Sequence, residues 1–161
     1  MIMANLIYLT LNGKNQGKIS VGCMSLDSIG NKSQIAHLDQ IMVYELNHRL
    51  TRISNVNHQC LTIKKPVDKS SPLLSKSIND NEILTCKFSV YRTNRFGINE
   101  LYYIIKLTGA HICDLQLHIP HVVDDSKGLA EETISFVYEA ISWEHCTAGT
   151  SSYSVWMDRV F

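Results

Sequence analysis

A hydrophobic pattern that repeats every two residues is the strongest guide to the fold of this sequence. Apolar and polar side chains alternate in four runs, at residues 42–50, 84–91, 113–119 and 134–140. Successive side chains of a β-strand point to opposite faces of a sheet, so each run predicts a strand with one buried face. Residues 101–107 are apolar on both faces and predict a central strand. The chain is therefore expected to consist mainly of antiparallel strands.

One helix signal interrupts the predicted strands. Ser70 offers an N-cap oxygen, and Pro72 suits the start of a helix because its missing N–H would have no partner there. Leu74 and Ile78 then lie on one face, so a short α-helix at about residues 72–79 should pack on the sheet. Four strands before the helix and four after it predict an antiparallel two-sheet β-barrel or sandwich with one flanking helix.

Length and composition fit a single domain over residues 1–161. Of the 161 residues 45% are hydrophobic, which is enough to bury a core. Fifteen basic and fifteen acidic residues cancel, so the basic excess of a nucleic-acid binder is missing and copies of the chain repel one another little. The tail at residues 148–161 is apolar and should close the barrel or dock on a neighbouring subunit.

The sequence also bears on the compartment in which the chain folds. It has no run of about 18 apolar residues, so membrane insertion is not expected. Residues 1–11 lack the basic cluster of a signal peptide and are typical of a strand. Folding in the cytoplasm is predicted, with export by a signal-independent route left open. Five widely spaced cysteines without a CxxC motif predict reduced, mostly buried thiols.

Candidate chemical residues form no recognised motif. The seven histidines are His37, His48, His58, His111, His118, His121 and His145. His118 and His121 are the nearest pair, but a separation of three on a strand points them to opposite faces, so neither a metal nor a cofactor is expected. Lys65 and Glu132 are expected to be solvated. A Cys60–His48 pair across a hairpin leaves a small cysteine-dependent hydrolase as an alternative, beside a secreted monomeric binding module.

Two segments are longer than a small core requires. Residues 25–40 form a polar connection, and long connections in small domains are often functional. Residues 41–65 predict a hairpin with its tip near residues 54–58. A projecting hairpin has to meet a partner, or its edge groups stay unpaired. Both segments are therefore candidate contact surfaces.

Family-like segments run in order along the whole chain. They are residues 4–17, 27–32, 39–41, 55–59, 66–74, 91–93, 102–108, 141–145 and 148–151. Together they resemble the haemolysin-coregulated protein (Hcp) family, the tail-tube proteins of type VI secretion systems. The resemblance implies a two-sheet β-barrel with one short helix, which agrees with the pattern of strands.

The resemblance also implies an assembly and its partners. Six protomers would form a ring, and rings would stack into a hollow tube that is fired by sheath contraction and carries small effectors in its lumen. The implied partners are other copies of the chain, the spike protein, the sheath and the effectors. No active site is implied, and the plain tube form without a C-terminal toxin domain is expected.

Contacts between stacked rings are expected from the two long segments. The candidate residues are Arg52, Asn55, Asn57 and His58 near the hairpin tip, with Asp27 and Asn31 in the long connection. Residues 46–53 and 96–100 depart from the family pattern. This departure leaves open that rings of this chain stack differently.

Overall fold

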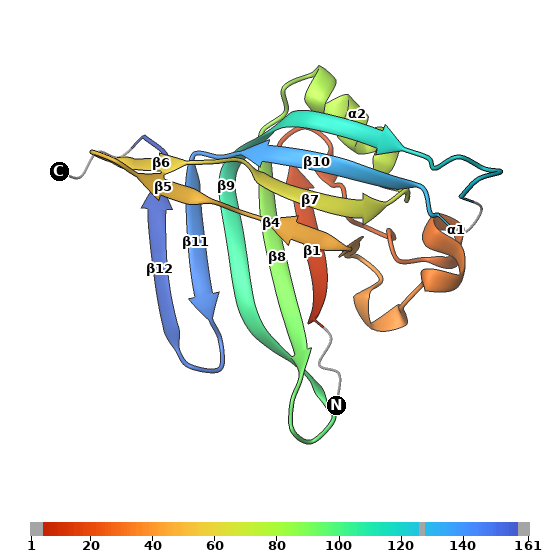
Figure 1. The fold of residues 1–161 in the computed structure, drawn as a ribbon, viewed down its shortest axis with the longest axis horizontal. Coiled ribbons are helices and arrows are strands. Elements are labelled where there is room, and N and C mark those ends of the chain that lie inside the picture. Colours follow the sequence, from red (N-terminus) through yellow and green to blue (C-terminus); the bar gives the residue numbers. More distant parts are fainter. Residues whose placement is uncertain (1–4, 126–127, 158–161) are drawn as a thin grey trace.

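The computed structural model describes residues 5–125 and 128–157, and most of them lie in strands (Figure 1). Before the main helix the strands are β1 (Asn5–Gly13), β2 (Gly17–Lys18), β3 (Ile41–Val43), β4 (Glu45–Asn47), β5 (Leu50–Arg52), β6 (Val56–His58) and β7 (Leu61–Pro66). After helix α2 (Ser71–Asn79) follow β8 (Leu84–Thr93), β9 (Asn99–His118), β10 (Glu131–Val137), β11 (Ala140–His145) and β12 (Thr150–Val155). Among these residues no helix is both long enough and apolar enough to span a membrane.

The long strand β9 takes part in two sheets. Its first half pairs with β8 and β11, and β1 and β12 extend this sheet on either side. Its second half pairs with β10, which is followed by β7 and β4. In Figure 1, β10, β7 and β4 cross over the sheet that contains β1, β8 and β11. The prediction of a mainly β, antiparallel two-sheet fold is confirmed.

Gly109 marks the place where β9 changes partners. Thr108 is the last residue paired with β11, and His111 is the first paired with β10. Gly109 has φ +61°, a conformation that residues with a Cβ rarely adopt. A Cβ at this position would lie 2.8 Å from Cβ of Glu139. A glycine is therefore required at this corner.

The inward faces of the two sheets form the core. Phe88 of β8 and Phe136 of β10 meet edge to face, with ring centroids 6.2 Å apart. The alternation over residues 84–91 is confirmed at Leu84, Cys86 and Phe88, which are fully buried. Burial of apolar side chains at about 25 cal/mol per Å² is the main force that holds the sheets together.

Two of the predicted strand runs extend too far. The run at residues 113–119 was expected to bury one face, but Cys113 is exposed and Ile119 is 61% exposed because the end of β9 passes beyond the core. The run at residues 134–140 crosses the turn between β10 and β11.

The predicted single strand over residues 42–50 is wrong for a different reason. Three short strands replace it: β3 pairs with β1, β4 pairs with β7 and β5 pairs with β6. Ile41 and Val43 are buried, whereas Tyr44 is exposed, so the inward face of β3 is opposite to the predicted one. The segment passes from one sheet to the other, and each piece follows its own partner.

Helix α2 confirms the predicted flanking helix, with one difference at its start. Ser70 is the N-cap but makes no side-chain capping bond, and its hydroxyl donates to Asp68 instead. Leu74 is fully buried against the core. The connection at residues 25–40 adds a four-residue helix, α1 (Leu26–Ile29), and two 3-10 turns, η1 (Gly30–Lys32) and η2 (Ile35–His37).

A buried ion network joins α2 to the second sheet. Lys65 of β7 was expected to be solvated, but it is fully buried, with its Nζ 2.9 Å from Glu132 Oε1 and 3.0 Å from Asp68 Oδ1. The Ser71 hydroxyl donates to the same Glu132 carboxylate. Buried charges are tolerated only when paired, so these partners keep the start of α2 on β7 and β10.

The apolar tail supplies an edge strand. β12 pairs with β11, and β11 is its only partner among the described strands. Trp156 packs against the core, while Tyr153 and Met157 are more than three-quarters exposed. The last four residues of the predicted tail, 158–161, lie outside the described residues.

Candidate interaction surfaces

The hairpin of β5 and β6 stands apart from both sheets. The two strands pair with each other and with no other described strand. Figure 1 shows this hairpin reaching past β11 and β12 at one end of the longest axis. Ile53 at its turn is 99% exposed, and Leu50 is 42% exposed. Apolar side chains on a projecting element are typical of a contact surface.

The base of the hairpin is fixed by a cluster of hydrogen bonds around one tyrosine. Tyr138 Oη lies 2.8 Å from His48 Nε2, just before β5, and 2.8 Å from His58 Nδ1, at the end of β6. The other nitrogen of His58 lies 3.0 Å from Ser154 Oγ in β12. Trp156 stacks on the His58 ring, with centroids 5.5 Å apart. We call His48, His58, Tyr138 and Ser154 the hairpin-base cluster.

The hairpin-base cluster is built from neutral groups. The phenol can donate to one imidazole and accept from the other, so its hydroxyl is satisfied on both sides while both histidines are uncharged. Burial lowers the pKa of His48, and the neighbouring His58 lowers it further. Burial also lowers the pKa of His58 and raises that of Tyr138. The cluster therefore favours neutral imidazoles.

The long connection covers the outer face of β1 at the other end of the molecule. The His37 ring stacks on Tyr8 with centroids 3.7 Å apart, and the Tyr8 hydroxyl donates to Gln34 Oε1 at 2.5 Å. Gln40 Nε2 donates to Thr10 Oγ1 at 3.3 Å. These contacts fasten residues 34–40 to the sheet. In Figure 1, α1 lies at the opposite end of the longest axis from the hairpin.

The six residues predicted to contact a stacked ring thus fall on two separate surfaces. Asp27 and Asn31 are exposed on the connection, and Arg52 and Asn57 are exposed on the hairpin. Asn55 is half-buried. His58 is only 4% exposed, so its imidazole belongs to the hairpin-base cluster and not to the surface of the protomer. The prediction that these surfaces contact another ring stays a prediction.

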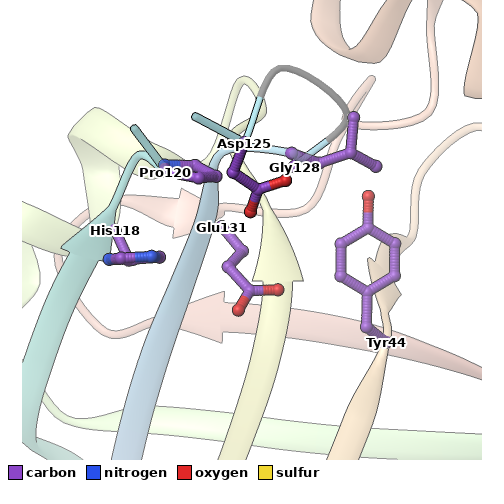
Figure 2. Close-up of a pocket in the computed structure, with 7 residues that line it drawn as sticks. Tyr44, His118, Pro120, Asp125, Gly128 and Glu131 are labelled. Carbon is purple, nitrogen blue, oxygen red and sulfur yellow. The ribbon is translucent and has the colours of Figure 1, made fainter. Parts of the chain in front are cut away.

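A hollow near α1 lies beside the end of β9. It has a volume of about 460 Å³ and is lined by Tyr44, His118, Pro120, Asp125, Gly128, Leu129 and Glu131. Figure 2 shows the carboxylates of Asp125 and Glu131 directed into the space between His118 and Tyr44. Val122 and Val123 are each more than 75% exposed. This end of the molecule thus combines acidic groups with exposed apolar side chains.

Most of the histidines and cysteines considered as chemical residues have structural hydrogen-bond partners. His121 Nδ1 accepts from the backbone N–H of Asp124 at 3.0 Å, and His145 Nδ1 accepts from that of Ala148 at 3.1 Å. His48 binds Tyr138, whereas Cys60 Sγ lies 3.6 Å from Cys113 Sγ, so the two members of the suggested Cys60–His48 pair have different partners. In the described part of the chain no three histidine, cysteine or acidic side chains gather as metal ligands would.

Comparison with known proteins identifies the family. A family model described as "Type VI secretion system effector, Hcp" matches residues 8–145. This chain belongs to the Hcp family. Hcp structures share its fold along nearly its whole length. A crystal structure of an Hcp protein has a TM-score of 0.90, with 28% identity over 96% of this chain and 99% of that one. The secreted protein Hcp3 from Pseudomonas aeruginosa has a TM-score of 0.87, with 33% identity over 96% of this chain and 100% of its own.

Two curated relatives differ in length. The "Major exported protein" of Pseudomonas aeruginosa is 32% identical over 98% of this chain and 99% of its own length. The "Uncharacterized protein YhhZ" of Escherichia coli strain K12 is 39% identical over 92% of this chain, which spans only 37% of that relative. Relatives of this chain are thus found both at its own size and with additional sequence. The name of the Pseudomonas relative indicates export.

The hairpin-base cluster was missed by the reasoning from sequence. Tyr138 falls in the alternating run at residues 134–140 and there looks like an ordinary inward residue of a strand. The only available signal was a phenol among aliphatic positions, since a buried tyrosine hydroxyl needs a hydrogen-bond partner. Its partners lie 80 and 90 residues away, so the sequence pattern does not indicate them.

Proposed function

We propose that this chain is a tube subunit of a type VI secretion system. Six copies form a ring, rings stack into a hollow tube, and the tube is exported on firing with small effectors in its lumen. Its partners are the spike protein, the sheath and those effectors. The proposal is carried by one observation: the match to Hcp structures spans 96% of this chain, with a TM-score of 0.90.

The placement of the exposed surfaces supports this proposal. The hairpin with Ile53 and the acidic, apolar end near α1 lie at opposite ends of the longest axis (Figure 1). Arg49 and Arg52 give the hairpin basic side chains, whereas the other end carries Asp27, Asp125 and Glu131 with Lys32 and Lys69 beside them. Unlike surfaces at opposite ends suit heterologous contacts, which produce rings when they close and filaments when they do not.

The first test is the oligomeric state. The purified chain should elute with a mass near six times 18.2 kDa in light scattering, and negative-stain images should contain annular particles. A monomer that persists at high concentration would contradict the proposal. The cysteine-hydrolase alternative loses the pair on which it was based, because Cys60 and His48 have different partners.

A substitution at the hairpin turn tests its role in stacking. Ile53→Ser should leave the protomer folded, because the side chain is 99% exposed and contributes little to it. If the hairpin contacts only the next ring, hexamers should persist. We expect it to reduce the stacking of rings at rising protein concentration, measured by sedimentation and imaging. Ile83→Ser, beyond the end of α2, is the matched control and should stack as the unmodified protein does. Equal stacking by both variants would exclude the hairpin from this contact.

A further inference from the structure

Two exposed thiols lie side by side at the root of the hairpin. Cys60 Sγ and Cys113 Sγ are 3.6 Å apart, and Cys113 Sγ is also 3.4 Å from the carbonyl oxygen of Ser135. The prediction of mostly buried thiols is wrong here: Cys23 and Cys86 are buried, but Cys60 and Cys113 are exposed. Exposure makes this pair accessible to small reagents.

Both cysteines occupy irregular backbone. Cys60 lies in the two-residue connection between β6 and β7. Cys113 lies where β9 has a bulge, opposite the register shift between Ser135 and Phe136 of β10. A disulfide brings its sulfurs to about 2.05 Å, so the pair must approach by roughly 1.5 Å. Connections and bulges can absorb such a movement more easily than regular strands.

We propose that Cys60 and Cys113 form a dithiol site that closes to an intramolecular disulfide when it meets a low-molecular-weight disulfide. The Cys60 thiolate attacks the small disulfide, forms a mixed disulfide and releases one small thiolate. Cys113 then loses its proton to solvent, attacks the Cys60 sulfur and releases the second thiolate. The protein dithiol is oxidised by two electrons, and the small disulfide is reduced to two thiols.

The local environment sets the order of these steps. Although Cys113 is exposed, partial desolvation of its sulfur and the hydrogen bond with Cys60 raise its pKa to about 11, so this group remains a thiol near neutral pH. The thiolate is the nucleophile in thiol–disulfide exchange. Cys60 therefore attacks first, and the short distance to Cys113 favours ring closure over loss of the mixed disulfide.

The disulfide would join the root of the hairpin to strand β9. Cys60 follows His58 of the hairpin-base cluster by two positions, and it is 53 residues away from Cys113 in the chain. A bridge over such a separation restricts the unfolded chain, so the oxidised protein should melt a few degrees higher. Formation of the site does not require the proposed function. Only the place of oxidation, outside the reducing cytoplasm, rests on it.

The test uses the full chain and oxidised glutathione as the probe. Intact mass should fall by two hydrogen atoms, non-reducing peptide mapping should link Cys60 to Cys113, and the rise in melting temperature should reverse with dithiothreitol. Cys60→Ser and Cys113→Ser should abolish all three effects, whereas Cys146→Ser should retain them. An unchanged mass while N-ethylmaleimide modifies both thiols would overturn the proposal, as would a link between other cysteines or between two chains.

A second measurement separates this site from the proposed export. The thiols of the chain in cell pellets and in culture medium can be trapped by alkylation at the moment of sampling. A reduced pair inside cells and a bridged pair in the medium is expected. If the chain never reaches the medium, the proposed function fails, whereas the reaction with glutathione still decides the dithiol site.

Discussion

Two buried polar clusters hold elements to the core, and they do so with opposite chemistry. The ion network at α2 pairs Lys65 with Asp68 and Glu132, all three of which are at least 94% buried. The hairpin-base cluster joins two imidazoles through the hydroxyl of Tyr138. The first fixes a helix that packs on the sheets. The second fixes a hairpin that pairs with no other described strand.

This difference indicates how rigid each element needs to be. A buried charge without its partner is strongly unfavourable, so the ion network enforces one position of α2. Neutral hydrogen bonds contribute about 1 kcal/mol each, so the hairpin can be released at much smaller cost. A helix that supports the core and a hairpin that is proposed to contact other subunits have those different requirements.

The largest expected effect comes from breaking the ion network. Lys65→Met leaves two buried carboxylates without their cation, and loss of one partner of a buried ion pair costs about 3–5 kcal/mol. The free energy of unfolding, measured by urea titration, should fall by that amount. Lys64→Met is the matched control, because this neighbour is 43% exposed and forms only a surface pair with Glu45. A similar loss of stability in both variants would contradict the special role of the buried ion network.

Removing the shared phenol should have a smaller effect that is concentrated on the hairpin. Tyr138→Phe leaves nitrogens of His48 and His58 without a partner, and each unsatisfied buried group costs about 1–3 kcal/mol. Hydrogen exchange should increase at residues 48–58 more than in β8 or β9. Tyr153→Phe, at an exposed tyrosine of β12, should change neither the free energy of unfolding nor the hydrogen exchange of the hairpin. An equal increase in hydrogen exchange over the whole chain would show that Tyr138 stabilises the core and not the hairpin in particular.

The smallest effect is a pH dependence confined to the same cluster. The pKa values of His48 and His58 lie below the ordinary 6.5, so the folded protein binds these protons less readily than the unfolded chain. The stabilisation is complete above about pH 6.5 and is lost as the pH falls through the lowered values. The protection factors of the hairpin amides, which correct for the slower intrinsic exchange at lower pH, should therefore fall as the pH is lowered below 6.5. In Tyr138→Phe this loss of protection should weaken, and a steeper loss would contradict the role of the phenol.

Local patterns predicted the elements whose signals are themselves local. The alternation at residues 84–91 predicted β8 because burial on one face requires apolar residues at every second position. Pro72 marked the start of α2 because it restricts the backbone there. The same reasoning failed at residues 42–50, where three short strands each take a different partner and no single period applies.

The sequence by itself determined the strand-rich class, the place of the flanking helix and the likeness to Hcp proteins along the chain. Only the tertiary structure decided that Lys65 is buried, that Tyr138 bridges two histidines and that Cys60 meets Cys113. These partners are separated by 53 to 90 residues. Their meeting depends on the register of strands and on the corner at Gly109, and a shift of one residue in β7 or β10 would turn Lys65 or Glu132 to the other face of its sheet.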